Sequence, residues 1–315
     1  MRRTLRPSLY FALVALSLAT AYAQTPNQVW LPSLDRVPSP TISSLAAIED
    51  ATGEIPDSSA FAVYRWDRFP SVIVLDMADF AEQDRMFSRL AFYLEKRGYR
   101  GRLLTDAQLA GKHGWNAHDY GSEELAAFFD AAEAARFPLD PEELLLRGIA
   151  LREGVIERRD DSGGGSALVP GSGAVLSISR SSSRYERMLL LAHESYHGIF
   201  FCQAEYRALC ERLWEAAPSA ERLFMTRLLA GLGYDPASHI LVVNEYQAYL
   251  LQQPRSLAPA YFGRVGKLLA GQAGVPTAAE VLPELLRDEA ALEDFLKARY
   301  AIEAGGAVLG PREGG

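Results

Sequence analysis

The sequence feature that most constrains the fold is a largely apolar predicted helix, residues 184–201, that carries two histidines and a glutamate in its second half. These are His193, Glu194 and His197. The segment has the composition of a helix that packs against a core. Burying two imidazoles and a carboxylate in such a helix is costly unless something pairs with them. The chain therefore has to fold around a partner for these side chains.

The spacing of these residues indicates what the partner is. Two histidines four residues apart lie on one face of a helix, one turn from each other, so both imidazoles can ligate one tetrahedral Zn²⁺. Glu194 lies about 100° round the helix from His193, near the metal without having to ligate it. There its carboxylate can take a proton from the attacking water and pass it to a leaving amine. This is the HExxH arrangement.

A catalytic zinc site takes three protein ligands and leaves one position for water. In metzincins the third ligand is a His six residues after the second one, but here that position is Gln203. Glu245 is the strongest candidate, because it is again a charge in an apolar helix and directly follows the apolar run Ile240 to Val243 and Asn244. Ala248, three residues later, offers a small surface at which the two helices can pack closely.

Other residues remain open for the remaining roles. His239 follows a turn and precedes Glu245 on the same predicted helix, and Glu205 lies just behind the first helix, so both are alternatives for the third ligand. Stabilising the oxyanion of a transition state needs a donor beyond the metal. Tyr246, Tyr249 and His239 are the candidates for that donor, and the sequence does not rank them.

The two helices together resemble a known family. The HExxH helix, the later Asn-Glu-x-x-Ala-Tyr helix and the strand before them are similar to the gluzincin metallopeptidases, the thermolysin-like branch of the zincins. The resemblance covers about residues 170–255. It implies that His193, His197 and Glu245 bind zinc and that Glu194 is the general base. The wider pattern, including residues 115–120, is similar to uncharacterised bacterial secreted proteins.

The chain departs from the thermolysin-like pattern at one position. Those enzymes carry an Asp four residues after the ligand Glu, which orients the first His, whereas here Tyr249 stands there. We expect the Tyr249 hydroxyl to orient His193 instead. In zincins the substrate adds to the sheet as an extra strand, and residues 174–179 are placed for that role if one edge of their strand is free. An internal strand is the open alternative.

The first 23 residues have the three-part layout of a secretory signal peptide. Arginines come first, the short apolar run Leu9 to Thr20 follows, and small residues end at Ala23. The run is too short to cross a bilayer, and an amphipathic anchor is the alternative. We therefore expect a secreted or periplasmic protein with no stable membrane insertion after cleavage. Removing three Arg changes the net charge from −8 to −11 (−8 − 3), which argues against nucleic-acid binding.

Periodicity along the chain predicts an α+β protein. A zincin-like catalytic half, with a small sheet, the active-site helix and a helical C-terminal part, follows an α/β N-terminal segment. The expected regions are 1–23 (signal peptide), 24–138 (α/β), 139–302 (catalytic) and 303–315 (flexible tail). Strands are predicted at 61–66, 71–75, 99–104, 155–158 and 174–179. Helices are predicted at 78–98, 122–136, 140–153 and 184–201, with mainly helical structure to 301. Residues 24–58 are expected to be an extended arm or short turns, residues 105–120 show neither period, and residues 160–173 are expected to be a loop rich in Gly and Ser.

A second group of polar residues has no recognised metal spacing. It contains His113, His118 and Asp119 beside Trp115 and Tyr120. One interpretation is a polar cluster that joins the two halves, with the aromatic residues as packing anchors. The other is that the group lines the substrate cleft, supplies the oxyanion donor or covers the site.

Cys202 and Cys210 can pair in an oxidising compartment. On one continuous helix they would lie about 12 Å apart along the axis, which is too far for a disulfide. Pairing therefore requires a turn at Gln203 and Ala204. The alternative is that Cys202 is a small apolar residue at a helix end.

The sequence predicts an exported zinc-dependent peptidase that acts on a peptide or protein substrate. Two other functions stay open: a zinc amide hydrolase that acts on cell-wall material, and a non-catalytic periplasmic zinc-binding protein. A fourth protein ligand, such as His113 or His118, would favour the non-catalytic function.

Overall fold

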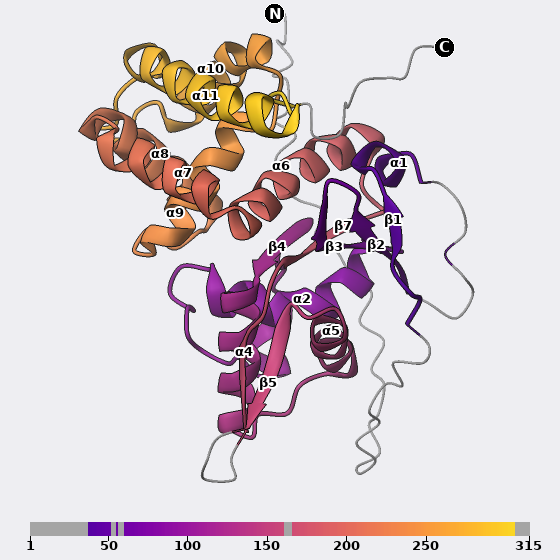
Figure 1. The fold of residues 1–315 in the computed structure, drawn as a ribbon. Helices are drawn as coiled ribbons and strands as arrows, with labels where there is room; N and C mark the ends of the chain where they lie inside the picture. Colours follow the sequence, from indigo (N-terminus) through magenta and orange to yellow (C-terminus); the bar gives the residue numbers. More distant parts are fainter. Residues whose placement is uncertain (1–36, 52–54, 56–59, 161–165, 306–315) are drawn as a thin grey trace, which may run out of the picture. The chain divides into compact units, whose positions relative to one another are not determined.

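The computed structural model describes residues 37–51, 55, 60–160 and 166–305 (Figure 1). They form a mixed α+β structure, in which a five-stranded sheet and its covering helices are followed along the chain by a helical C-terminal part. The predicted α+β class, with an α/β N-terminal segment, is confirmed. The predicted signal peptide, residues 1–23, lies outside the described residues.

The sheet is built from both predicted regions of the chain. Its strands, in spatial order, are β1 (Thr41–Ser43), β2 (Phe61–Trp66), β3 (Phe69–Met77), β7 (Ala174–Ser179) and β4 (Ala117–Gly121). Strand β7 pairs in parallel with β3 and antiparallel with β4. It is therefore an internal strand, and the expectation that its edge is free for a peptide is wrong. Among the described strands, β4 is the outermost one on this side of the sheet.

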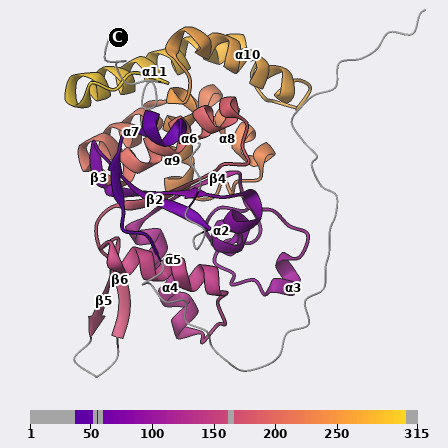
Figure 2. The ribbon, with the colours of Figure 1, turned by 90° about the vertical axis from the view of Figure 1, so that its right-hand side faces the viewer.

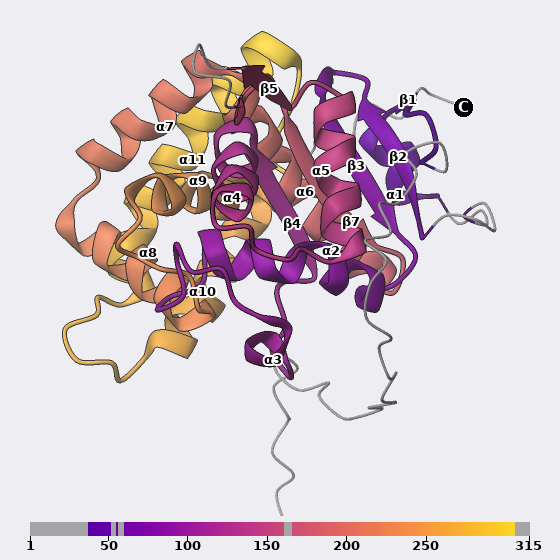
Figure 3. The same ribbon diagram turned by 90° about the horizontal axis from the view of Figure 1, so that it is seen from below.

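Helices cover both faces of the sheet (Figure 2 and Figure 3). One face packs against α1 (Leu45–Glu49), α6 (Arg184–Cys202) and the helices that follow α6. These are α7 (Ala204–Ala216), α8 (Ser219–Leu232), α9 (His239–Leu251), α10 (Ala258–Leu269) and α11 (Ala278–Tyr300). The other face packs against α2 (Phe80–Leu94), α4 (Ser122–Ala134) and α5 (Pro141–Arg152). The short helix α3 (Asp106–Leu109) and the hairpin β5 (Ile156–Asp160) and β6 (Ser166–Pro170) complete these elements.

Two hydrophobic cores result from the alternation of side chains along the central strands. Val74 and Leu176 point into the core that α6 and α9 complete, whereas Leu75 and Val175 point into the core beneath α2 and α4. Because both faces of β3 and β7 are covered, nearly all of their side chains are buried.

The helix boundaries follow the predicted capping signals. Ser183 and Glu186 form the capping box that begins α6, and Asp140 caps α5 ahead of Pro141. Helix α2 ends at Leu94, earlier than predicted, and Gly98 follows in a left-handed conformation with φ of 80°.

Four local predictions differ from the structure. Residues 99–101 form a turn and residues 102–104 have no regular secondary structure, so the predicted strand is wrong, because Gly98 and Gly101 (φ of 73°) reverse the chain on either side of Tyr99. The part of the expected arm that is described contains β1 and α1, and residues 117–121 and 166–170 are strands in regions with no predicted strand. The first residues of the expected tail also pack, because Gly305 donates from its main chain to Leu251 and Ala304 is buried.

Both cysteines are free in the described structure. The chain does turn at Gln203, between α6 and α7, where a disulfide would require it. The Cys202 thiol nevertheless accepts a hydrogen bond from Ser71 at 3.4 Å, and Cys210 is buried in the core. Cys202 thus fits the alternative of a small residue at a helix end.

In the described part of the chain, no helix has the length and apolar character needed to span a membrane.

Helix α11 carries a buried carboxylate with an expected effect on stability. Both oxygens of Glu289 are buried without a hydrogen-bond partner among the described residues. Burial, reinforced by the charge of Glu293, raises the pKa of Glu289 from 4.5 to about 7. A carboxyl group whose pKa is higher in the folded protein than in the unfolded chain binds more protons in the folded state. Its stabilising contribution is therefore full below about pH 4.5 and is lost as the pH rises through about 7.

We expect Glu289→Gln to raise the melting temperature above that of the wild type at pH 8, by about 2–4 °C, and to change it little at pH 5. Thermal unfolding followed by circular dichroism at both pH values measures this difference. Asp294→Asn, at an exposed position of the same helix, is the matched control. It should change the melting temperature by the same amount at pH 5 and at pH 8. An equal shift of Glu289→Gln at pH 5 and pH 8 would contradict the prediction.

Candidate metal centre

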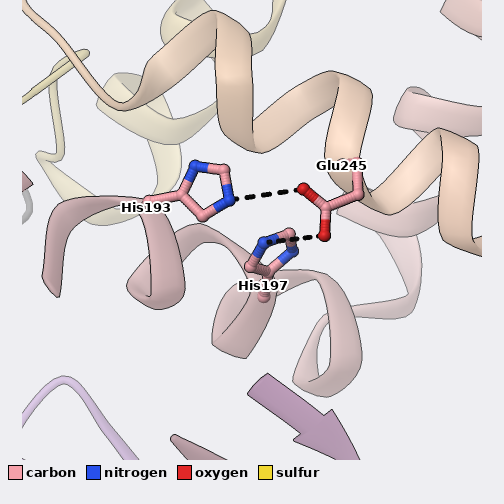
Figure 4. A group of neighbouring side chains, drawn as sticks. All are labelled: His193, His197 and Glu245. Atoms are coloured by element: carbon pink, nitrogen blue, oxygen red, sulfur yellow. Dashed lines mark ion pairs between the residues drawn. The ribbon is translucent and has the colours of Figure 1, made fainter. Parts of the chain in front are cut away.

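Helices α6 and α9 bring the three expected ligands together. His193 and His197 lie one turn apart on α6, which packs against α9, β4 and β7. Figure 4 shows both imidazoles facing the Glu245 carboxylate of α9. The Nε2 atom of His193 lies 3.4 Å from one Glu245 oxygen, and Nε2 of His197 lies 3.8 Å from the other. The three residues that the sequence predicts as ligands are therefore neighbours in the fold.

The donor set fits a zinc ion. Ligand atoms of a tetrahedral site with bonds of 2.0–2.1 Å lie about 3.4 Å apart, close to the separations found here. Three buried atoms on the side of the metal position have no hydrogen-bond partner within the described structure: Nε2 of His197, one oxygen of Glu194 and one of Glu245. Buried polar atoms are normally paired. Unpaired imidazole and carboxylate atoms that converge on one point are the arrangement that a divalent cation satisfies.

The charges of the site also favour a bound cation. Burial lowers the pKa of His197 to about 4, so that its imidazole is neutral and can ligate. Burial raises the pKa of Glu194 to about 8, and the charge of Glu245 adds to this effect. The pKa of Asp119 is also raised, by burial and then by the charges of Glu194 and Glu245. A divalent cation among these carboxylates would act in the opposite sense and stabilise their ionised forms.

Each histidine directs its other ring nitrogen at an oxygen. Nδ1 of His193 lies 2.9 Å from Oε1 of Gln252, and Nδ1 of His197 lies 3.5 Å from Oδ2 of Asp119. A hydrogen bond at Nδ1 fixes the tautomer and leaves the Nε2 lone pair for a metal. Such partners are the usual surroundings of ligating histidines.

The predicted role of Tyr249 as the residue that orients His193 is wrong. The Tyr249 ring packs edge-on against the His193 ring, with centroids 4.7 Å apart, and Gln252 is the partner of Nδ1. Tyr249 is still a neighbour of the site, so its role as an oxyanion donor stays a prediction.

Several alternatives of the sequence lie elsewhere. His239 is exposed at the start of α9, where Nε2 lies 2.7 Å from Glu211, so it is neither a ligand nor an oxyanion donor in this structure. Glu205 is exposed and pairs with Arg299. The Tyr246 hydroxyl contacts carboxylates of α8 and α11 instead of the metal group, which consists of His193, His197 and Glu245.

The second His group divides between three places. His113 is exposed and contacts Asp84, while His118 is buried on the α2 face of the sheet, where Nδ1 lies 3.0 Å from Ser177 Oγ. His113 thus makes a surface contact, and His118 packs against Phe87 of α2. Asp119 is adjacent to His118 but points to the other face of β4, where one of its oxygens lies in the same group as Glu194 and His197, all within 4.8 Å. The fourth ligand expected from His113 or His118 is therefore not found there.

Gln252, Asn244 and Asp119 are the site residues to which the sequence assigned no specific role. Asn244 stands beside the ligand Glu245 in the motif, and its Nδ2 donates to Asp119 Oδ2 at 3.2 Å. Gln252 lies one residue past the end of α9 and carries no signal of its own. Strand alternation would place Asp119 opposite His118, but only once β4 is recognised as a strand.

The contact of Gln252 with His193 makes a prediction about metal binding. We expect Gln252→Ala to weaken zinc binding by about 10–100-fold, since an unsupported imidazole is a poorer ligand. Competition with a chromophoric chelator measures the dissociation constant. Gln253→Ala is the matched control, because the Gln253 amide donates to main-chain carbonyls of α9. Equal zinc affinity of Gln252→Ala and Gln253→Ala would contradict the prediction. An equal loss of zinc affinity in Tyr249→Phe would also contradict it.

Comparison of the chain with protein-family models, with curated proteins and with solved structures finds no match. The resemblance to gluzincins therefore stays a prediction, and the functional argument rests on the residues of the site.

Proposed function

We propose that the protein is an exported zinc-dependent peptidase. The observation that carries the proposal is the buried group of His193, His197 and Glu245, in which unpaired donor atoms converge. A further carboxylate, that of Glu194, lies beside this group and also has an unpaired oxygen. A site that only stored zinc would not need this last group. Export is inferred from the layout of residues 1–23.

The chain's own residues have distinct roles in this proposal. His193, His197 and Glu245 hold the metal, and a zinc ion there supplies Lewis-acid activation of water. Glu194 accepts a proton from the attacking water and delivers it to the nitrogen of the leaving amine. Burial excludes bulk water from Glu194, which strengthens its interaction with charge that develops during the reaction.

The position of β4 supports a peptide as substrate. Among the described strands, β4 is the outermost one on the side of the sheet near the metal group. Its residue Asp119 lies beside Glu194 and His197. An extended peptide can pair with the outer side of β4 through main-chain hydrogen bonds. The strand-addition role that the sequence suggested for residues 174–179 is thus better proposed for residues 117–121.

One observation favours a non-catalytic zinc-binding protein as the second candidate. Asp119 approaches both Glu194 and His197, and a carboxylate that completed the coordination of the metal would close the position needed for water. A cell-wall amide hydrolase shares the proposed chemistry and differs in substrate alone.

A digest of a mixed peptide library by the purified protein, read by mass spectrometry, tests the proposal. We expect cleavage that 1,10-phenanthroline stops and added Zn²⁺ restores. Zinc bound at about one ion per chain without cleavage of any peptide or cell-wall amide would favour the non-catalytic candidate. Absence of bound zinc would overturn both.

A further inference from the structure

We propose that Asp119 is a positioning residue, which orients His197 for a metal and is itself aligned by a hydrogen-bond relay that begins at Tyr206. The inference rests on the proposed zinc site, because it concerns how one of its ligands is prepared. It assigns a metal-supporting role to strand β4, far from both HExxH and Glu245 in the sequence.

The contact with His197 is the first step. His197 is fully buried, and its Nδ1 atom faces Asp119 Oδ2 at 3.5 Å. A neutral imidazole that binds a metal through Nε2 carries its hydrogen on Nδ1, and in His197 Nε2 is the nitrogen that faces Glu245 and the metal position. The Nδ1–H group is then directed at Asp119, and a bound cation favours the ionised form of Asp119, which accepts hydrogen bonds.

Asn244 is the second neighbour of this imidazole. An amide can offer either its oxygen or its NH₂ group, so Asn244 alone would not settle which nitrogen of His197 is protonated. Its orientation here is set, because Nδ2 donates to Asp119 at 3.2 Å and Oδ1 accepts from Gln247 Nε2 at 3.3 Å.

The relay continues away from the metal. Gln247 also donates to the main-chain oxygen of Asn244 at 2.9 Å, and its Oε1 accepts from the Tyr206 hydroxyl at 2.7 Å. Tyr206 and Gln247 are fully buried, so water does not compete for these bonds. Every donor along the path from Tyr206 to Asp119 points toward Asp119, which makes this carboxylate the acceptor of the Asn244 bond.

The backbone holds Asp119 at this place. Residues 117–121 pair with β7 along their whole length, with Asp119 opposite Leu176. His118 and Tyr120, on either side, are buried in the other core. The side chain of Asp119 is therefore aimed by a strand that is fixed on both sides of it.

The isosteric change Asp119→Asn gives the sharpest test. An Asn at this position would accept from Asn244 through its oxygen and present NH₂ to His197, which favours hydrogen on Nε2, the wrong nitrogen for the metal. We expect Zn²⁺ to bind about 10–100-fold more weakly, as measured by chelator competition. We also expect ¹⁵N-resolved NMR of His-labelled, zinc-loaded protein to show a shifted Nδ1–H signal of His197 in this variant, because the acceptor of that group has been replaced.

Tyr206→Phe tests the far end of the relay without touching the metal group. Tyr300→Phe is its matched control, since the Tyr300 hydroxyl also donates to a glutamine oxygen, that of Gln203, at 2.8 Å. We expect Tyr206→Phe to weaken Zn²⁺ binding a few-fold and Tyr300→Phe to leave it unchanged. If the relay did not align Asp119, the two variants would bind Zn²⁺ equally.

The outcomes separate this inference from the proposed function. Wild-type zinc affinity in Asp119→Asn, an unchanged Nδ1–H signal of His197, or equal affinities of Tyr206→Phe and Tyr300→Phe would each overturn the inference. A wild-type protein that binds no zinc would overturn the proposed function itself. Because zinc affinity is the readout, the test does not depend on finding a substrate.

Discussion

Replacing Glu194 with Gln is expected to lower peptide hydrolysis by about 10²–10⁴-fold while the protein keeps its zinc. The amide has nearly the shape of the carboxylate but cannot accept the proton of the attacking water. Because Glu194 is not one of the three proposed ligands, metal content should stay near one ion per chain. The cleavage rate of the best library peptide, compared at equal zinc occupancy, measures the effect.

The matched control for this substitution is Glu205→Gln, which changes an exposed glutamate close behind the same helix. It should retain the wild-type rate. A Glu194→Gln variant that is fully active on every wild-type substrate would show that the proposed mechanism is wrong.

His193→Ala is expected to remove bound zinc and activity together while the protein stays folded. The substitution deletes one of three ligands, and the remaining pair, His197 and Glu245, cannot complete the coordination that a catalytic zinc needs. Elemental analysis after dialysis should find about one zinc per wild-type chain and almost none in the variant. Far-ultraviolet circular dichroism checks the fold.

His239→Ala provides the comparison, because His239 lies at the exposed start of α9, where it pairs with Glu211. Its zinc content should equal that of the wild type. Retention of a full equivalent of zinc by His193→Ala would rule out the ligand set proposed here.

That His193, His197 and Glu245 form one group could be predicted because their signals are local. Two histidines four residues apart on a helix share a face whatever surrounds them. A glutamate inside an apolar run, as at Glu245, is conspicuous because burying a lone charge is costly. Both signals can be detected within a single helix.

The supporting residues could not be predicted in the same way. Gln252 supports His193 because α9 ends beside α6, and Asp119 supports His197 because β4 pairs with β7. These contacts depend on the tertiary arrangement, and the sequence window around each residue contains no sign of them. Residues 117–121 also lack a strand's alternation of polar and apolar side chains, since β4 has buried residues on both faces.

The failures in secondary structure have local causes of another kind. Residues 99–104 are rich enough in large side chains to suggest a strand, but the flanking glycines adopt positive φ and turn the chain. The internal position of β7 was one of two readings, and only the pairing with both β3 and β4 decided between them.

The place of β7 between β3 and β4 also sets an order of folding. A chain that ends before Ala174 has β3 and β4 but lacks the strand that joins them. No other described strand pairs with β4, so Asp119 finds its position only after β7 has formed, and the group of His193, His197 and Glu245 is complete only after α9 has followed. Such distant pairings close large loops and slow folding. The centre is therefore assembled late, from segments that meet after most of the chain has been synthesised.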